Sequence, residues 1–289
     1  LNPDFVQTDC KGHPGHTSWY SQVPGATVSP GVKRDALKGW RQATAQLGLP
    51  LHCHYSGIWD DAAGEKHPEW CRVDAEGKAV AGRMCPRGPY LEELMLPQLI
   101  ELVDRYQIDG FWVDGEIWAV EPCYCERCRV AFTQATGIAQ PPKEPGEADW
   151  PAWFEFSLQS FEAHVTRYCE VLHSLRPAAL VCSNWLQTFR HPGEPKVPTD
   201  WISGDNTWVF GLDGCRCESR FISTRGKPWD IMIWSFYAAQ GMGQVDSPWT
   251  FKPVQMVQQE AAVVVALGGS VQVYEHPAGL RNGQLIPWR

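Results

Sequence analysis

The sequence predicts an α/β fold, and within that class a (β/α)8 TIM barrel, from three observations. Short apolar segments alternate with segments of helical periodicity along the chain, which is the pattern of parallel βαβ units. Polar and aromatic residues gather directly after the predicted strands, where a barrel opens its functional face. The chain has 289 residues, 44% of them apolar, enough for one barrel of about 250 residues. A doubly wound sheet is the alternative, but no glycine-rich phosphate-binding segment supports it.

The predicted strands and helices alternate in the order that a barrel requires. Seven strands are expected at residues 5–9, 49–55, 109–114, 179–183, 201–204, 229–234 and 270–274. Helices are expected at residues 33–47, 89–106, 125–136, 153–175, 214–224 and 253–267. Seven strands are one short of a closed barrel. We therefore interpret residues 1–289 as one barrel domain, with the first strand expected before Leu1 and the last helix beyond Arg289.

Composition and charge exclude several classes of protein. The net charge of −8 opposes binding to nucleic acid or to an anionic membrane. No run approaches the roughly 18 apolar residues of a membrane-spanning helix, and the first residues contain no secretory signal. Cysteines without the spacing of a disulfide framework favour the cytoplasm. The protein would be secreted or periplasmic if an upstream signal has been removed. The sequence leaves open whether the chain forms a homo-oligomer.

The segment Asp109-Gly-Phe-Trp-Val-Asp-Gly-Glu116 is the sharpest candidate for catalytic chemistry. An apolar strand ends in two acids, Asp114 and Glu116, which extended backbone would point to the same face. Cleavage of a glycosidic bond needs two carboxyl groups, one at the anomeric carbon and one to protonate the leaving oxygen. Asp114 and Glu116 are the predicted pair, and Asp205 is a further catalytic candidate. Other acids that could serve as partner are Asp60, Asp61 and Glu275; alternatively, Asp114 only caps the following loop.

The 15 Trp residues predict a site with flat apolar surfaces. Sugars present apolar C–H faces beside hydroxyl groups, so a site that binds them combines aromatic rings with hydrogen-bonding side chains. Histidines gather after the first strand and alternate on the second. Without a third matched ligand, we interpret them as groups that bind hydroxyls rather than a catalytic metal. The predicted substrate-binding residues are His13, His16, His54, Tyr55, Trp59, Trp112, Trp185, Trp234 and Glu275.

Three cysteines within six residues, Cys123, Cys125 and Cys128, predict a metal site. This spacing is tight enough to chelate one tetrahedral Zn²⁺. Cys85 is the best candidate for the fourth ligand, and Cys71 is the second. Four thiolates close the coordination sphere, so the zinc would be structural and no catalytic cofactor is expected. The alternatives are reduced thiols or a local disulfide.

Two of these motifs resemble those of known enzymes. The run from Asp109 to Glu116 resembles the strand-four motif of α-L-fucosidases of glycoside hydrolase family 29, and this resemblance implies that Asp114 is the nucleophile. The segments Cys85-Pro-Arg-Gly-Pro-Tyr90 and Cys123-Tyr-Cys-Glu-Arg-Cys128 resemble the zinc-binding loops of family 42 β-galactosidases. In that family an Asn-Glu pair closes strand four, with Glu as acid/base. Here Gly115 stands at the Asn position.

The chain as a whole is similar to a group of glycoside hydrolases that combines both features, the hypothetical glycosyl hydrolase 6 group. Lys11-Gly-His-Pro-Gly15, His67-Pro-Glu-Trp70 and the cysteine motif are typical of that group. The resemblance implies a retaining glycosidase that releases a terminal sugar, as an α-L-fucosidase does. Asp114 would be the nucleophile, and Glu116 or Asp205 the acid/base.

Three other interpretations remain. The first is a β-galactosidase-like hydrolase. The second is a non-catalytic carbohydrate-binding barrel, which would keep the aromatic surface without the pair of acids. The third is a metal-dependent hydrolase that uses the histidines. A glycoside or oligosaccharide is the expected partner in the first two.

Overall fold

The computed structural model describes residues 3–116, 121–184, 193–194, 196–206, 211–238, 249–275, 280–281 and 284–285. The chain forms two compact units. Unit 1 comprises Leu1–Trp185 and Lys196–Thr199, and unit 2 comprises Leu186–Pro195 and Asp200–Arg289. The seven predicted strands divide between the units, four in unit 1 and three in unit 2.

A six-stranded sheet in the order β3-β2-β1-β4-β7-β8 forms the centre of unit 1. The strands β1, β4, β7 and β8 are parallel and span Val6–Lys11, Leu51–Ser56, Gly110–Asp114 and Leu180–Ser183. Two short strands, β2 (His16–Thr17) and β3 (Thr27–Val28), extend the sheet beyond β1. The parallel strands follow one another in space as they do in sequence, as expected when each crossover adds one neighbouring strand.

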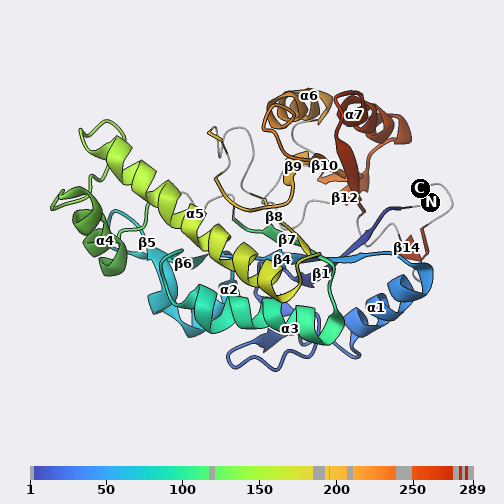
Figure 1. The fold of residues 1–289 in the computed structure, drawn as a ribbon, viewed down its shortest axis with the longest axis horizontal. Coiled ribbons are helices and arrows are strands. Elements are labelled where there is room, and N and C mark those ends of the chain that lie inside the picture. Colours follow the sequence, from blue (N-terminus) through green and yellow to red (C-terminus); the bar gives the residue numbers. More distant parts are fainter. Residues whose placement is uncertain are drawn as a thin grey trace. The chain divides into compact units, whose positions relative to one another are not determined.

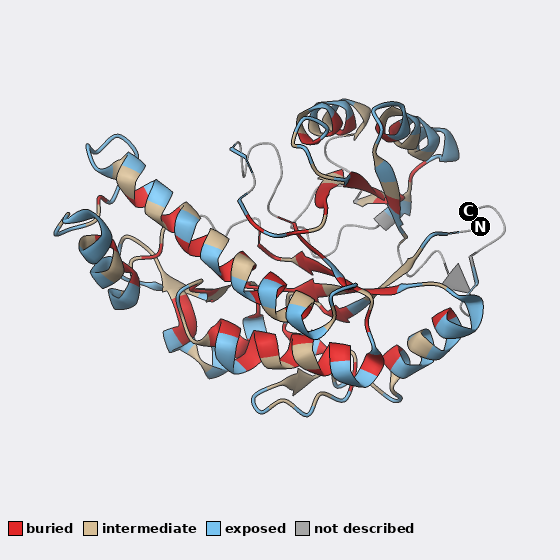
Figure 2. Ribbon diagram, in the orientation of Figure 1, coloured by how far each residue is buried: buried red, intermediate tan, exposed pale blue. Residues whose placement is uncertain are grey.

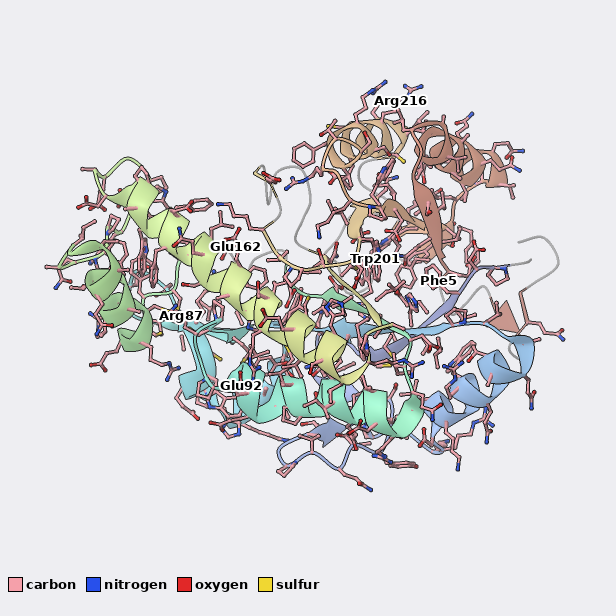
Figure 3. All side chains as sticks on the ribbon, in the orientation of Figure 1. Phe5, Arg87, Glu92, Glu162, Trp201 and Arg216 are labelled. Carbon is pink, nitrogen blue, oxygen red and sulfur yellow. The ribbon has the colours of Figure 1, made fainter. Side chains whose placement is uncertain are left out.

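Helices connect these parallel strands. They are α1 (Ala36–Leu47), α3 (Leu96–Tyr106) and α5 (Trp150–Leu175). Helix α3 contacts both α1 and α5 (Figure 1). A π-helical turn, η2 (Leu91–Met95), leads into α3. Arg167 of α5 makes a bidentate ion pair with Glu92 of this turn, at 2.8 and 3.1 Å, which joins the two helices (Glu92 is labelled in Figure 3).

The parallel sheet of unit 1 has an apolar face toward the helices and a polar face opposite. Tyr55 and Val113 are register partners and fully buried, and the hydroxyl of Tyr55 reaches Gln98 of α3. Figure 2 shows the strands of this sheet coloured mainly as buried. Because side chains alternate along a strand, the neighbours of these residues point the other way. That opposite face carries the register partners Asp9, His54 and Trp112.

A second group of elements in unit 1 follows the ends of β4 and β7. It contains the helix α2 (Asp61–Lys66), a 3-10 turn η1 (Pro68–Trp70), the antiparallel hairpin of β5 (Cys71–Val73) and β6 (Ala79–Met84), and the helix α4 (Glu126–Thr136). Asp60 caps the N-terminus of helix α2, and its carboxylate accepts a hydrogen bond from the backbone N–H of Ala63 at 2.8 Å. The sequence predicts α4, but neither α2 nor the hairpin.

Unit 2 has a three-stranded parallel sheet in the order β13-β10-β9. Its strands are Ser270–Tyr274, Trp229–Trp234 and Ile202–Asn206, and its helices are α6 (Gly211–Ile222) and α7 (Val254–Ala266). Two small antiparallel pairs complete it, β11 (Phe236–Ala238) with β12 (Trp249–Phe251), and β14 (Leu280–Arg281) with β15 (Gln284–Leu285).

This sheet of unit 2 also has one apolar and one polar face. Ile231 of β10 and Ile222 of α6 pack where Gly204 leaves room, so this side faces the helix. On the other side the buried carboxyl of Asp230 accepts hydrogen bonds from Ser203 at 2.5 Å and from Gln272 at 2.6 Å. Burial raises the pKa of Asp230 to about 6.

The structure confirms the α/β class, the seven predicted parallel strands and the six predicted helices, with boundaries shifted by a few residues. The parallel strands that the structure describes form two sheets, so a closed barrel stays a prediction, as does a single domain over residues 1–289. Within the described ranges, no helix has the length and apolar character needed to cross a bilayer.

Candidate active site

Asp114 ends strand β7, and its carboxylate is the centre of a polar cluster on the polar face of the sheet. Its Oδ2 accepts a hydrogen bond from Nε2 of His54 at 3.0 Å and lies 3.4 Å from Nε2 of His13. Its Oδ1 accepts a hydrogen bond from the side-chain amide of Asn184 at 2.9 Å. Strand β4, the loop after β1 and the end of β8 therefore each supply one partner. The side chain of Asp114 is 17% exposed, so the carboxylate keeps an accessible edge.

The cluster holds the Asp114 carboxylate in its ionised form. Burial alone would raise its pKa, but the hydrogen bond and charge of His54, the charge of His13 and the hydrogen bond from Asn184 hold the pKa of Asp114 well below its usual value. His54 also forms an ion pair with Asp9 through Nδ1. Burial favours neutral His54, yet its hydrogen bonds to Asp114 and Asp9 raise the pKa of His54 to about 10. An ionised, partly exposed carboxylate is the form that attacks a carbon centre.

His13 is held in place from two sides. The hydroxyl of Ser56 donates to the carbonyl of Trp59 at 2.6 Å and therefore accepts from Nδ1 of His13 at 2.7 Å. The imidazole stacks on the indole of Trp59, with centroids 4.1 Å apart and planes 3° apart. The guanidinium of Arg83 lies over the same indole at 3.5 Å. Because Nδ1 is engaged, Nε2 is the nitrogen that His13 directs toward Asp114.

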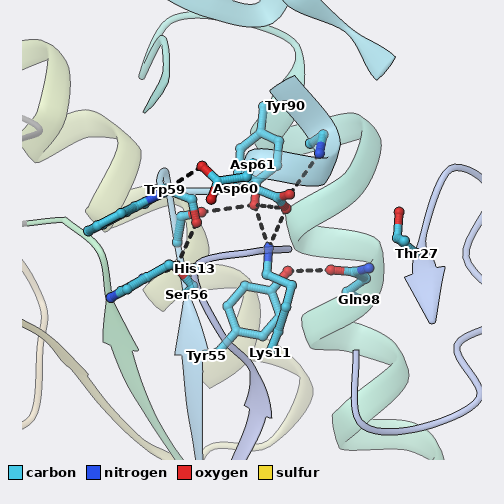
Figure 4. Close-up of polar contacts among 12 residues, drawn as sticks. Lys11, His13, Thr27, Tyr55, Ser56, Trp59, Asp60, Asp61, Tyr90 and Gln98 are labelled. Atoms are coloured by element: carbon cyan, nitrogen blue, oxygen red, sulfur yellow. Dashed lines mark hydrogen bonds and ion pairs between the residues drawn. The ribbon is translucent and has the colours of Figure 1, made fainter. Parts of the chain in front are cut away.

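A buried network holds the loop that carries Trp59 (Figure 4). Nζ of Lys11 donates to Asp60 and to the hydroxyl of Tyr90, both at 2.6 Å, and the Tyr90 hydroxyl donates to the carbonyl of Gly57 at 2.8 Å. Lys11 and Asp60 are 0% and 1% exposed. Burial lowers the pKa of Lys11; burial would raise that of Asp60, but the charge of Lys11 holds it below its usual value. A buried ion pair with this many hydrogen bonds fixes the end of β4.

The structure contradicts the predicted role of Glu116. This side chain is 0% exposed, and its Oε2 accepts hydrogen bonds from Ser183 at 2.5 Å and from Tyr168 of α5 at 3.0 Å. Gly115 has φ +70°, a left-handed conformation that interrupts the alternation of strand side chains. Asp114 and Glu116 therefore point to opposite sides of the sheet. Glu116 has no access to a substrate, so its prediction as acid/base is wrong.

Several other predicted residues lie elsewhere. Tyr55 is fully buried against α3, where its hydroxyl donates to Gln98 at 2.5 Å, so its prediction as a substrate-binding residue is wrong. Trp112 is 1% exposed and packs against His54, with ring centroids 5.3 Å apart. Trp112 therefore supports the cluster by packing against His54. His16 is exposed on β2 and lines a separate groove. Trp185 lies outside the described residues.

The alternative partner acids of unit 1 are also engaged. Asp60 is committed to the ion pair with Lys11. Asp61 accepts a hydrogen bond from Nε1 of Trp59 at 3.0 Å and lies 3.8 Å from Arg83, and it stays half exposed. Neither acid contacts Asp114 in the described part of the chain.

Unit 2 brings two predicted residues together. Nε1 of Trp234, at the end of β10, donates to Oδ1 of Asp205 on β9 at 2.8 Å. Glu275 follows β13 directly and is partly buried. Both acids thus lie at the C-terminal ends of parallel strands, where barrel enzymes place catalytic groups. The roles of Asp205, Trp234 and Glu275 stay predictions.

The structure brings the four predicted cysteines together. The sulfur atoms of Cys85, Cys123, Cys125 and Cys128 all lie within 4.8 Å of one another. Cys85 comes from the end of β6, and the other three lie before and within α4. Cys71 is not part of the set. The described cysteines, this set included, form no disulfide in the structure.

Sequence reasoning missed three residues of the cluster: Asn184, Ser56 and Asp9. Asn184 and Ser56 end strands β8 and β4, and Asp9 lies near the end of β1. Their position at strand ends was the available signal, because the C-terminal ends of parallel strands meet at one edge.

The comparison with family models decides the family. Residues 4–185 match the model of the family described as alpha-L-fucosidase, which is more than half of the chain. The chain belongs to the alpha-L-fucosidase family. The matched range contains Asp114 and the described side chains that surround its carboxylate, His54, His13 and Asn184. No sequence among the curated proteins matches the chain.

Solved structures of alpha-L-fucosidases share the fold of this chain. Isoenzyme 2 from Paenibacillus thiaminolyticus matches with a TM-score of 0.75 and 19% identity, over 97% of this chain and 42% of that one. The alpha-fucosidase of Thermotoga maritima matches with a TM-score of 0.50 and 18% identity, over 98% and 49%. A variant of AlfC from Lactobacillus casei, bound to 4-nitrophenyl-α-L-fucopyranoside, matches with a TM-score of 0.50 and 13% identity, over 93% and 67%. The chain thus spans less than half the length of the first two.

Proposed function

We propose that this protein hydrolyses a terminal α-L-fucosyl bond, with Asp114 as the nucleophile. The observation that carries the proposal is the ionised carboxylate at the end of β7, held by His54, His13 and Asn184 within the part of the chain that matches the alpha-L-fucosidase family. Nε2 of His13 can offer a hydrogen bond to a sugar hydroxyl. Trp59 packs against His13 and Trp112 packs against His54, which restricts the motion of the two histidines.

The proposed reaction is a double displacement. An oxygen of Asp114 attacks the anomeric carbon as the bond to the leaving oxygen breaks, and a carboxylic acid protonates that oxygen. Water, deprotonated by the same acid/base, then cleaves the fucosyl ester and restores the carboxylate. With Glu116 excluded, Asp205 is the proposed acid/base, because its carboxylate ends a parallel strand and is already oriented by Trp234.

We also propose that the strands belong to one barrel. Each unit has helices against one face of its parallel sheet and polar side chains on the other. A sheet with an isolated polar face suits the lining of a barrel whose mouth binds a polar ligand. The match to the Paenibacillus fucosidase over 97% of this chain supports one shared architecture.

A panel of 4-nitrophenyl glycosides tests the proposed function. We expect release of nitrophenol from the α-L-fucoside and not from the β-D-galactoside. Turnover of the galactoside alone would instead support the β-galactosidase-like alternative. Saturable binding of fucose without turnover of any glycoside would support the non-catalytic barrel.

The four-cysteine cluster is proposed to hold a structural Zn²⁺. In a tetrahedral site with Zn–S bonds of about 2.3 Å, sulfur atoms lie about 3.8 Å apart. Here the sulfur of Cys85 lies 3.8 Å from that of Cys125 and 3.5 Å from that of Cys128. The backbone N–H of Val73 donates to the sulfur of Cys123 at 3.5 Å, a contact that suits a thiolate. The residues therefore fit the ion, which would join β6 to α4 and take no part in the reaction.

Metal analysis tests the zinc proposal. We expect one zinc per chain and its loss in Cys128→Ser, together with a lower Tm, because binding energy at a structural site is folding energy. Cys71→Ser is the matched control, since Cys71 is buried nearby but outside the set, and it should keep the metal. Full zinc content in Cys128→Ser would contradict the assignment.

A further inference from the structure

A groove in unit 1 is used by nothing described so far, and one of its lining residues, Asp9, pairs with His54 of the Asp114 cluster. It encloses about 600 Å³ and lies among the end of β1, the loop that follows it and the segment that enters α1. The polar side chains that line it are Asp9, His16, Ser18, Ser29, Lys33 and Arg34. His16, which sequence analysis assigns to substrate binding, has its place here.

One imidazole ring joins this groove to the nucleophile. Nδ1 of His54 pairs with Asp9 in the wall of the groove, and Nε2 of the same ring donates to Asp114 at 3.0 Å. A sugar whose anomeric carbon lies at Asp114 therefore has the groove within the reach of the next residue of its chain. In a glycosidase that releases a terminal sugar, this next residue is the leaving group.

The charges in the groove indicate what that residue carries. Lys33 and Arg34 are exposed, and neither forms an ion pair with another side chain in the described part of the molecule. The chain as a whole has a net charge of −8, so a groove lined by two adjacent cations and one carboxylate, Asp9, is a local exception. Exposed cations in a groove attract and orient an anionic ligand. The hydroxyls of Ser18 and Ser29 and the ring of His16 supply hydrogen bonds for a sugar.

We propose that this groove is the leaving-group subsite, and that it selects an anionic sugar, one bearing a carboxylate or a sulfate ester. The proposal rests on the proposed function, because it defines the aglycone of the same reaction. Asp9, next to the reacting centre, accepts sugar hydroxyls, while Lys33 and Arg34 receive the anion. The structure thus assigns the substrate class as fucosyl units attached to acidic glycans.

Matched disaccharides test the proposal. One pair compares α-L-fucosyl-glucuronate with α-L-fucosyl-glucose, and a second compares α-L-fucosyl-galactose 6-sulfate with α-L-fucosyl-galactose, in one linkage. We expect kcat/KM to favour the acidic member of at least one pair by about three- to tenfold, mainly through KM, and to lose this preference at high salt. Preference in the first pair alone identifies the carboxylate, and in the second alone the sulfate.

The variant Lys33→Gln/Arg34→Gln should abolish the preference while leaving hydrolysis of 4-nitrophenyl fucoside unchanged. Lys38→Gln/Lys78→Gln is the matched control, because it removes the same charge from exposed positions outside the groove. Equal kcat/KM within both pairs, or a preference that the control variant also removes, would overturn the subsite.

Calorimetric binding to the Asp114→Asn protein separates this inference from the proposed function. If no fucoside is hydrolysed but the acidic disaccharides bind more tightly through Lys33 and Arg34, the binding site in the groove is supported and the proposed hydrolysis is contradicted. If fucosides are hydrolysed without any dependence on the anion, the leaving-group subsite is contradicted and the proposed hydrolysis is supported.

Discussion

The two carboxylates at the end of strand β7 lie in opposite environments, one on each face of the sheet. On the polar face, Asp114 is partly exposed and has histidine and amide partners from three segments. On the helix face, Glu116 is sealed under α5 and bound by two hydroxyls. The two acids stand two residues apart in the sequence, yet only one of them can meet a ligand.

The difference comes from the residue between them. Gly115 adopts φ +70°, and a Cβ at this position would approach Oγ of Ser56 and Cβ of Trp59 to 2.9 Å. Only glycine takes this conformation readily and fits this space. One backbone dihedral thus separates a candidate catalytic carboxylate from a structural one.

The largest expected effect is on turnover. Asp114→Asn keeps the size of the side chain but removes the nucleophile, so kcat for 4-nitrophenyl fucoside should fall by at least about a thousandfold. Glu116→Gln is the matched control, because it makes the same chemical change behind the strand, and its folded fraction should keep most of its activity. Rates of the two variants, measured beside their tryptophan fluorescence, decide the comparison; an active Asp114→Asn protein would end the nucleophile assignment.

The free energy of unfolding should depend more on Glu116 than on Asp114, the reverse of the order for turnover. Glu116→Ala leaves the hydroxyls of Tyr168 and Ser183 without their acceptor and opens a cavity, which should cost about 2–4 kcal/mol of unfolding free energy. Glu116→Gln keeps an acceptor and should cost less. Urea unfolding measures both. A change below about 0.5 kcal/mol in Glu116→Ala would mean that the buried contacts are not formed.

The substitution Gly115→Ala tests the residue that separates the two carboxylates. A side chain at positive φ, in close contact with Ser56 and Trp59, should lower the unfolding free energy by about 1–3 kcal/mol. It should also reduce kcat, because Asp114 moves with the backbone. Gly137→Ala is the control, since Gly137 also has positive φ but open space around its Cα. An activity loss that is equal in both variants would point to general destabilisation.

The smallest effects concern pH, where His52 and His54 on one face of β4 differ. His52 stacks on Phe5 in the space left by Gly110, and burial, opposed by the charge of Asp109, lowers the pKa of His52 to about 4. His52 therefore contributes stability that is present above pH 6.5 and is lost as the pH falls toward 4. For His54, with its pKa raised to about 10, the contribution is complete below pH 6.5 and is lost as the pH rises toward 10.

Unfolding free energies of His52→Gln and His54→Gln, measured from pH 5 to pH 9.5, test these opposite signs. The cost of His54→Gln should be about 1–2 kcal/mol at pH 6 and should shrink at pH 9.5. The cost of His52→Gln should shrink on the acid side instead. Parallel pH profiles would contradict the assignment of His54 as charged and His52 as neutral.

The sequence predicts the parts of this molecule that depend on local patterns. The seven parallel strands follow from apolar runs with turn residues around them, and the cysteine site follows from spacing within six residues plus one distant Cys85. Asp114 follows from its place at a strand end. Apart from Cys85, these features need no knowledge of long-range contacts.

Other features depend on geometry that the sequence does not state. The opposite orientation of Glu116 depends on the dihedral of Gly115, and the ion pair of Lys11 with Asp60 joins residues 49 positions apart. The burial of Tyr55, by contrast, follows from local geometry. His54 and Tyr55 are neighbours on one strand, so they cannot both point to the same face.

If Asp114 is the nucleophile, it forms a covalent bond to the sugar during the reaction, and this bond can be trapped. The protein is incubated with 2-deoxy-2-fluoro-α-L-fucosyl fluoride, digested, and sequenced by tandem mass spectrometry. We expect one fluorofucosyl group per chain, attached to Asp114 and absent from Asp114→Asn. A label on another carboxylate, or equal labelling of the variant, would contradict the nucleophile assignment.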